Sequence, residues 1–468
     1  MKFSKNQIYF LGIGGIGMSA LAQYFAANGY IVAGYDRTKN NVCELLEVLN
    51  INIHYKDNVD LIPELFKNSE KTLIIITPAL EKDDANNYEL TFFKKNGFEI
   101  INRAKTLGLI TNSENSIAIA GAHGKTSITS ICANIFSKSK YDCNAFSGGI
   151  CKNFMSNFHQ GKSNFFIIEA DEYNRSFHEL LPTTALITYI DPDHLDIYEN
   201  KQNLFDAFVI FANNIKQNGC LVISNYVPIH FIKKIRPDIK IFVYGIKNEK
   251  QKLDFFADNI KYENGNCFFD FNYNNGKIEK IKYKLGGNHN IENAIAAASC
   301  AFINKISEEE IRFGLESFEG VERRFDIKIA DKNFIYIDDY AHHPNEIKAF
   351  LNSVRLLYPL KKITGIFQPH TFTRTRDFYM EFAESLSLCD VIILLPIYPA
   401  REKPIYGITS EMIFNKIEKK EKYICEKSEL FKILNTIKTD ILLTIGAGDI
   451  DREVKNILEW YTFGVKNI

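Results

Sequence analysis

A glycine-rich stretch followed by a lysine and a threonine is the strongest chemical signal in this sequence. In "IAIAGAHGKTSITSICANIF", an apolar strand pattern leads through a glycine loop into a helical pattern. Backbone amides of such a loop bind phosphates, a lysine neutralises the β and γ oxygens, and a threonine hydroxyl is a ligand for Mg²⁺. The common spacing requires glycine where this chain has Ile119, so the loop is a shortened variant; a turn that only needs glycine is the alternative. The residues predicted to form this ATP-type site are Gly121, Ala122, His123, Gly124, Lys125, Thr126 and Ser127.

Two further polar positions follow apolar strand patterns in the same region. Glu169 ends "FFIIE", at the end of a strand where open α/β sheets place their ligands, and could bind Mg²⁺ directly or through water. His194 follows "ALITYI" and lies in an acidic loop. An ordinary strand-end carboxylate and a packed or surface histidine are the alternatives. The candidate metal ligands are therefore Thr126, Glu169 and His194.

A second glycine pattern lies close to the start of the chain. Gly12, Gly14 and Gly17 in "FLGIGGIGMSALAQYF" fit G-x-G-x-x-G between an apolar strand pattern and an amphipathic helix. Asp36 ends the next strand pattern, where an acidic side chain accepts from a ribose hydroxyl in dinucleotide-binding units. The residues alone favour NAD, with a turn that merely needs glycine as the alternative. They predict that a phosphorylated ligand binds here.

The elements that position these residues follow an α/β pattern. Strands alternate with helical patterns almost throughout, which indicates parallel sheets with helices on their faces. At 468 residues the chain exceeds one hydrophobic core, and we expect three domains, with boundaries at 1–112, 113–319 and 320–468. Within them, "FNYNNGKIEKIKYK" predicts a hairpin and "NKIEKKEKY" a solvated helix face.

Composition excludes several classes of function. The 56 Lys and Arg residues against 57 Asp and Glu leave a net charge of −1, so no broad basic surface is available for nucleic acid. Nine scattered cysteines, never spaced C-x-x-C, argue against a disulfide framework or a zinc site and favour a reducing cytoplasm. Because no apolar run approaches ~20 residues, we expect no membrane span.

Together and in this order, the motifs resemble those of the bacterial Mur ligases. The resemblance rests on "GIGGIGMSALA" and "GYD" in the first domain, on "GAHGKT", "EADEYNRSF", "DPDHLD" and "GGNHNIENAIAA" in the second, and on "RRFD", "DDYAHHPNEI", "FQPHTFTRTRDF" and "GAGDI" in the third. It implies a Rossmann-like UDP-sugar-binding domain, a central P-loop ATPase domain with a largely parallel sheet, and a C-terminal Rossmann-like domain that binds the amino acid. On this resemblance the first glycine loop binds the diphosphate of a UDP-sugar and not NAD.

The resemblance also implies a reaction. L-alanine is joined to the lactyl carboxylate of UDP-N-acetylmuramate through an acyl phosphate, with ATP and Mg²⁺ as cofactors, in cytoplasmic peptidoglycan precursor synthesis. We expect small-molecule substrates, no nucleic acid, no membrane, and a monomer or homodimer. The alternatives are a murein peptide recycling ligase acting on the same sugar nucleotide, an NAD-dependent oxidoreductase, and a non-catalytic nucleotide sensor. An oxidoreductase would leave the ATP loop, Glu169 and His194 unused. The intact set of Lys125, Thr126, Glu169 and His194 argues against a non-catalytic sensor.

By the same resemblance, individual residues are assigned to each ligand. The UDP-sugar-binding residues are Gly12, Gly14, Gly15, Gly17, Asp36 and Thr77. The ATP contacts outside the loop are Asn290 and Asn293 for adenine, Arg324 for the phosphates and Asp339 for the ribose. The residues implied in catalysis are Lys125, Glu169, His194 and Arg324. A helix N-cap for the asparagines and interdomain salt bridges for Arg324 and Asp339 are the structural alternatives.

The residues implied for L-alanine are His342, His370 and Arg374. Several family members carry a basic residue directly after "QPH", but this chain has Thr371 there. The charge that binds the amino-acid carboxylate is therefore expected from Arg374, with Arg376 as a possible second.

Overall fold

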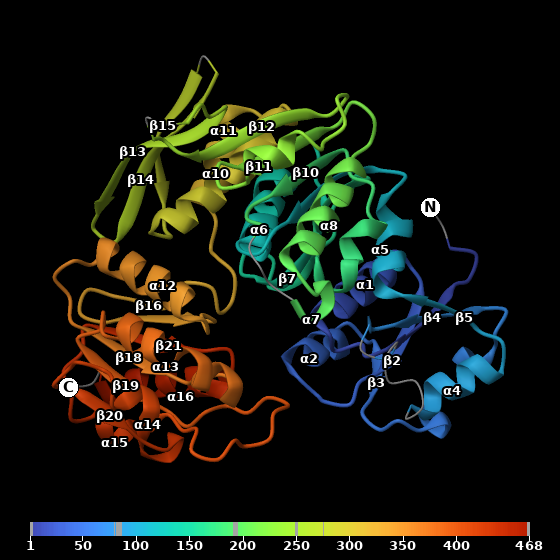
Figure 1. Cartoon of the computed structure of the whole chain (residues 1–468). Helices are drawn as coiled ribbons and strands as arrows, with labels where there is room; N and C mark the ends of the chain where they lie inside the picture. Colours follow the sequence, from blue (N-terminus) through green and yellow to red (C-terminus); the bar gives the residue numbers. More distant parts are fainter. Residues whose placement is uncertain are drawn as a thin grey trace. The chain divides into compact units, whose positions relative to one another are not determined.

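The computed structural model describes residues 3–78, 80, 87–190, 195–248, 251–274 and 276–465. These residues form three sheets of five, ten and six strands, with helices between the strands, so the expected α/β class is confirmed (Figure 1). The chain divides into two compact units, one formed by residues 1–259, 269–281 and 292–319 and the other by residues 260–268, 282–291 and 320–468. Each predicted domain range contains one sheet, but the units are divided differently, so the three domain boundaries stay a prediction.

The first sheet, drawn in blue in Figure 1, is parallel throughout, in the order β3-β2-β1-β4-β5. Its central strands β1 and β4 are mostly apolar and every residue in them is buried, as expected for a parallel sheet covered on both faces. Because the strands run the same way, the residues that follow β1, β4 and β5 lie at one edge. The strands are β1 (Gln7–Leu11), β2 (Ile31–Tyr35), β3 (Asn52–His54), β4 (Thr72–Ile76) and β5 (Glu99–Asn102); the helices are α1 (Ile16–Ala27), α2 (Asn41–Val48), α4 (Tyr88–Lys95) and α5 (Arg103–Thr111).

The second sheet has the order β15-β14-β13-β12-β11-β10-β6-β9-β7-β8. β6 lies between β10 and β9 and is parallel to both, so the residues that follow these three strands share one edge. The strands are β6 (Asn115–Ala120), β7 (Asn144–Cys151), β8 (Ser156–His159), β9 (Phe165–Glu169), β10 (Thr184–Ile187), β11 (Cys220–Ser224), β12 (Lys240–Ile246), β13 (Phe255–Glu263), β14 (Asn266–Tyr273) and β15 (Gly276–Tyr283). The helices are α6 (Lys125–Ser137), α7 (Leu195–Tyr198), α8 (Lys201–Asn213), α9 (Ile229–Ile232), α10 (Asn288–Ile303) and α11 (Glu308–Glu316). β14 and β15 are neighbours, as the predicted hairpin requires.

The third sheet, orange to red in Figure 1, has the order β16-β17-β21-β18-β19-β20. Only β16 is antiparallel to its neighbour, so the residues after β17, β21, β18, β19 and β20 share an edge. The strands are β16 (Asp326–Ala330), β17 (Ile335–Asp339), β18 (Ile363–Phe367), β19 (Val391–Leu394), β20 (Lys422–Ile424) and β21 (Ile441–Ile445). The helices are α12 (Pro344–Leu357), α13 (Phe372–Leu386), α14 (Glu411–Phe414), α15 (Leu430–Leu434) and α16 (Arg452–Trp460).

The helix predicted over "NKIEKKEKY" is wrong. α14 ends at Phe414, and the strand β20 begins at Lys422. The Lys422 ammonium donates to the carbonyl oxygens of Phe414 and Ile417, both at 2.9 Å, and Ile417 is buried, so these contacts fold the segment back before β20. Over the described part of the chain, no helix has the length and apolarity needed to cross a membrane.

Candidate functional site

The predicted ATP loop connects β6 to α6 and contains two glycines with positive φ. Gly124 has φ +81° and directly precedes Lys125, the first residue of α6. Gly121 has φ +126°, and a Cβ there would lie 2.1 Å from Oγ1 of Thr188. Side chains other than glycine are strained in this region of φ. The loop therefore needs glycine at both positions and presents the N-terminus of α6, which favours phosphate binding.

Lys125 is held by two acceptors in this structure. Its Nζ donates to the carbonyl oxygen of Gly121 at 2.8 Å and forms an ion pair with Oε1 of Glu172 at 2.6 Å. Glu172 is only 1% exposed, and burial raises the pKa of its carboxyl, while the Lys125 charge opposes that rise. Among the described residues, Oε2 of Glu172 has no hydrogen-bond partner. Glu172 thus fixes the position of the loop lysine, and the sequence alone did not predict this contact.

Thr126 and Glu169 are brought together, as predicted. Oγ1 of Thr126 donates to Oε1 of Glu169 at 3.0 Å, and the backbone N–H of Gly148 donates to Oε2 at 2.6 Å. A hydroxyl and a carboxylate are hard oxygen ligands of the kind that Mg²⁺ prefers, so this pair fits the metal. No group of three or more potential ligands occurs in the parts of the chain that the structure describes. His194, the third candidate, lies outside the described residues.

The two asparagines assigned to adenine have different surroundings. A Cβ at Gly124 would lie 2.4 Å from Oδ1 of Asn293, so this side chain packs directly against the ATP loop. Asn290 is buried, and its Nδ2 donates to the carbonyl oxygen of Gly286 at 2.8 Å. The structure therefore brings Asn293 to the loop, whereas the amide of Asn290 already has a partner within its own segment.

The side chain of Asp36 forms a hydrogen bond with the backbone of the first glycine loop. Oδ2 of Asp36 accepts from the backbone N–H of Gly14 at 2.8 Å, and Oδ1 accepts from that of Thr38 at 3.0 Å. Gly15 is the N-cap of α1, and a Cβ at Gly12 would lie 2.8 Å from Cγ2 of Thr77. The predicted residues are thus together at one edge of the first sheet. The carboxylate binds the loop itself, in addition to any contact with a ribose.

The two arginines of "RRFD" differ in what they contact. Arg323 donates to the carbonyl oxygen of Gly446 at 2.6 Å, and its guanidinium lies 5.0 Å from the ring centre of Tyr340. Arg324 is exposed, and its charge acts on Asp339 and His342. Arg323 therefore has a structural role, whereas Arg324 is accessible to a ligand.

Asp339 ends β17 and accepts two backbone N–H groups. Those of Phe325 and Ala341 donate to its two carboxyl oxygens at 2.6 and 2.8 Å. Burial raises the pKa of this carboxyl to about 7, although both hydrogen bonds favour the charged form.

His342, His370 and Arg374 form one cluster, as predicted. The two imidazole rings lie 5.8 Å apart between centroids, and Nη1 of Arg374 lies 3.5 Å from Nδ1 of His370. Nδ1 of His342 donates to the carbonyl oxygen of Tyr340 at 2.9 Å. Burial lowers the pKa of His342, and it lowers the pKa of His370 to about 4. Both histidines are therefore neutral near pH 7, and the guanidinium supplies the positive charge.

Comparison with known proteins identifies the family to which this chain belongs. Family models match in succession: the Mur ligase family catalytic domain over residues 7–115, the Mur ligase middle domain over 119–301 and the Mur ligase glutamate ligase domain over 323–448. The UDP-N-acetylmuramate–L-alanine ligase of Parabacteroides distasonis is 44% identical over 453 residues, which are 97% of this chain and 96% of that protein. The chain belongs to the Mur ligase family.

Other members of the Mur ligase family are similar over the same length. A protein with the same name from Porphyromonas gingivalis is 42% identical, covering 96% of this chain and 97% of its own. The crystal structure of a UDP-N-acetylmuramate-alanine ligase from Thermotoga maritima superposes with a TM-score of 0.80 at 27% identity, covering 97% of this chain and 99% of that one. A murein peptide ligase from Psychrobacter arcticus shares the fold, with a TM-score of 0.66 at 20% identity.

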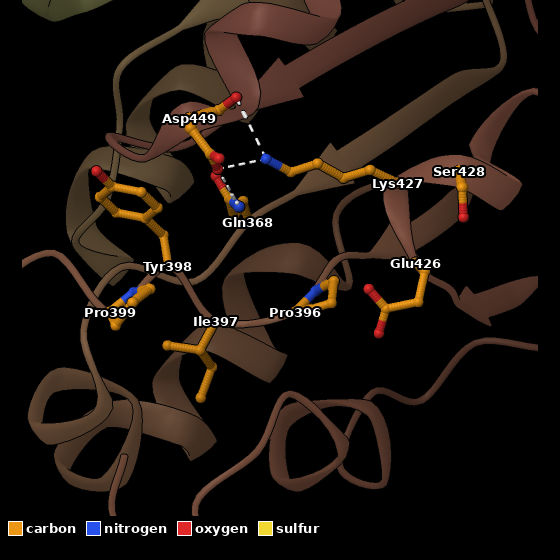
Figure 2. A pocket seen from close by; sticks show the side chains of 9 residues that line it. All are labelled: Gln368, Pro396, Ile397, Tyr398, Pro399, Glu426, Lys427, Ser428 and Asp449. Atoms are coloured by element: carbon orange, nitrogen blue, oxygen red, sulfur yellow. Dashed lines mark hydrogen bonds and ion pairs between the residues drawn. The ribbon is translucent and has the colours of Figure 1, made fainter. Parts of the chain in front are cut away.

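This Mur ligase also has a pocket beside the histidine cluster. It has a volume of about 450 Å³ and lies at the edge of the third sheet. Figure 2 shows Lys427 pointing toward Asp449, with which it forms an ion pair, while Nε2 of Gln368 donates to the same carboxylate at 2.9 Å. Tyr398 lines the pocket and stacks on His370 with 5.8 Å between ring centroids. Tyr398 thus contacts both the pocket and His370, one of the residues predicted to bind L-alanine.

Proposed function

We propose that this Mur ligase joins L-alanine to the lactyl carboxylate of UDP-N-acetylmuramate, as a step of peptidoglycan synthesis, while ATP is converted to ADP and phosphate. The observation that carries the proposal is the pair of glycine loops. Both are built for a phosphorylated ligand, but only the second contains the lysine and threonine that act on a transferable phosphoryl group. Relatives named for this reaction are 42–44% identical over nearly the whole chain, which supports the choice of substrates. Because all nine cysteines are free thiols, which suits a reducing compartment, we place the reaction in the cytoplasm.

The chemistry explains what the residues must do. A carboxylate is a poor electrophile, so the γ-phosphoryl group is first transferred to it, giving an acyl phosphate. The neutral amine of L-alanine then attacks the carbonyl carbon, and the tetrahedral intermediate expels phosphate. Such transfers depend on alignment and charge neutralisation rather than on covalent protein groups. Lys125 and Arg324 supply positive charge to the phosphates in this proposal, Asn290 and Asn293 bind adenine, and Asp339 binds the ribose.

We further propose that Thr126, Glu169 and His194 are Mg²⁺ ligands. Thr126 and Glu169 are supported by their direct contact at 3.0 Å. When bound, Mg²⁺ neutralises charge on the phosphate oxygens and the substrate carboxylate. Glu169 and Thr126 hold their oxygens together at the edge where β6 and β9 end, next to Lys125, which the proposal assigns to the same phosphates.

Replacing Arg374 by alanine should raise the KM for L-alanine on the order of 100-fold, because a charge-assisted bidentate contact to the carboxylate is lost. The neutral histidines cannot compensate near pH 7. The KM for ATP should stay within about twofold. Steady-state kinetics with each substrate varied in turn measure both constants.

Arg376→Ala is the matched control, because Arg376 lies on the same helix and is already paired with Asp377 at 2.7 Å. A large rise in the KM for L-alanine in this variant, with Arg374→Ala near normal, would reassign the carboxylate contact to Arg376.

Replacing Asp36 by alanine should raise the KM for UDP-N-acetylmuramate by about tenfold or more, because the N–H of Gly14 loses its acceptor and the diphosphate loop loses its order. The KM for ATP should stay nearly unchanged, since the second glycine loop serves ATP. The exposed Asp60 in the same domain provides the control variant Asp60→Ala. A rise in the ATP constant alone would reverse the assignment of the two loops.

The experiment that tests the proposed function compares amine substrates. Purified protein is incubated with ATP, Mg²⁺ and UDP-N-acetylmuramate plus L-alanine, glycine, L-serine or the murein tripeptide, and the sugar nucleotide product is identified by mass. We expect L-alanine to give the highest kcat/KM. Efficient ligation of the tripeptide with no ligation of L-alanine would show that the protein is a murein peptide recycling ligase.

A further inference from the structure

We propose that Arg103 binds an anionic group of the sugar nucleotide at the first glycine loop, and that Asp171 positions it there. The inference rests on the proposed function, since it takes a UDP-sugar as the ligand of that loop. Arg103 belongs to none of the motifs that predicted the site, and its place follows from the fold.

Arg103 is the first residue of α5, directly after β5. Asn102 caps this helix by accepting from the backbone N–H of Lys105 at 2.9 Å, which fixes where α5 begins. Because β1, β4 and β5 are parallel neighbours, Arg103 starts from the same edge as the loop after β1. Its side chain can therefore reach the loop across the end of β4.

The guanidinium of Arg103 lies against the first turn of α1. A Cβ at Gly17 would lie 2.7 Å from Nη1 and 2.9 Å from Cδ of Arg103. The third glycine of the motif thus makes room for this side chain. Any larger residue at position 17 would push the guanidinium away from the turn whose N–H groups face the ligand.

Asp171 holds the other side of the guanidinium. Nη2 of Arg103 donates to Oδ2 of Asp171 at 3.0 Å, while Oδ1 accepts from the N–H of Tyr173 at 3.0 Å. Asp171 lies between Glu169 and Glu172, which contact Thr126 and Lys125 of the ATP loop. One short segment therefore contacts the ATP loop on one side and fixes Arg103 at the first loop on the other.

The chemistry of this position suits an anion. N–H groups at the start of a helix attract negative charge, and a guanidinium adds donors in a fork that matches phosphate and carboxylate. A UDP-N-acetylmuramate molecule carries both groups, in its diphosphate and in its lactyl carboxylate. The side chains of Arg103 and Asp171 keep 17% and 37% of their area exposed. Ion pairs that solvent can reach contribute little to stability, so the salt bridge alone gives a weak reason for leaving position 17 without a side chain.

Calorimetric titration with UDP, UDP-N-acetylglucosamine, UDP-N-acetylmuramate and ADP tests the proposal in wild type, Arg103→Ala and the control Lys105→Ala. We expect Arg103→Ala to raise the Kd for UDP on the order of 10- to 100-fold, with ADP binding unchanged. The exposed Lys105 on the same helix should be replaceable without effect. If only the affinity for UDP-N-acetylmuramate falls, the group that Arg103 binds is the lactyl carboxylate. Unchanged affinity for all three uridine ligands would overturn the proposal.

A charge-reversed double variant, Arg103→Asp with Asp171→Arg, separates binding from a structural ion pair. We expect its melting temperature to recover relative to Arg103→Ala while its affinity for the uridine ligand stays low. Recovery of both the melting temperature and the affinity would show that Arg103 acts only through a salt bridge, and would overturn the proposal.

Gly17→Ala should fold and show the same loss of affinity for the uridine ligand as Arg103→Ala. Wild-type affinity in Gly17→Ala would also count against the contact. If the wild type itself bound no uridine nucleotide and formed no product, the proposed function would fail first.

Discussion

Replacing Lys125 by alanine is expected to lower kcat for ligation on the order of 10²-fold or more, because its charge is needed most while the phosphoryl group is in transfer. The KM for UDP-N-acetylmuramate should change little, since the first glycine loop is untouched. Initial rates of ADP formation, with each substrate varied, give both constants. Replacing Glu172 by glutamine should have a smaller effect of the same kind, because Lys125 stays but loses the ion pair at 2.6 Å that positions it.

The control for this prediction is Lys140→Ala, which removes an exposed lysine just beyond the same helix. Near-normal turnover in the Lys125 variant would contradict the assignment of the ATP loop. Equal loss in both variants would indicate a general effect of charge instead of a phosphate contact.

Replacing Glu169 by alanine should lower kcat by a factor on the order of 10² and raise the Mg²⁺ concentration that gives half-maximal activity. The variant loses a carboxylate that contacts both Thr126 and the N–H of Gly148. Titration of activity with Mg²⁺ at saturating substrates measures the second effect, which a purely structural role would not produce.

Glu169→Gln keeps the shape of the side chain and an oxygen for one of these contacts, so it separates packing from charge. We expect it to resemble Glu169→Ala in its Mg²⁺ requirement and wild type in its melting temperature. The exposed Glu179 supplies the matched control Glu179→Ala. An unchanged Mg²⁺ requirement in both Glu169 variants would show that another group binds the metal.

Local patterns predicted the fold well where one strand, one glycine loop and one helix follow each other. β1 with α1 and β6 with α6 are such units, and buried apolar runs followed by glycine mark each of them. The segment 415–423 was misjudged because its charged pattern suits an exposed helix equally well. Its actual course depends on the Lys422 ammonium, which lies within the segment and donates to the carbonyl oxygens of Phe414 and Ile417, a contact that the charge pattern alone does not reveal.

The individual residues of the candidate site could be predicted from the sequence, but not which side chains contact each other. Lys125 and Glu172 are 47 residues apart, and Arg103 and Asp171 are 68 apart. Which acidic side chain of "EADE" meets which partner depends on how the chain turns after β9, where Asn174 and Arg175 have positive φ. In the same way, the letters "RRFD" do not reveal which arginine is structural.

The most direct test of the proposed ligation follows one oxygen atom from the substrate carboxylate. UDP-N-acetylmuramate labelled with ¹⁸O in its lactyl carboxylate is incubated with ATP, Mg²⁺, L-alanine and the protein, and the released phosphate is analysed by mass spectrometry. An acyl phosphate intermediate predicts one ¹⁸O atom in each phosphate, because a carboxylate oxygen leaves with the phosphate when the amine displaces it. Unlabelled phosphate, or phosphate release that does not require both the sugar nucleotide and L-alanine, would contradict it.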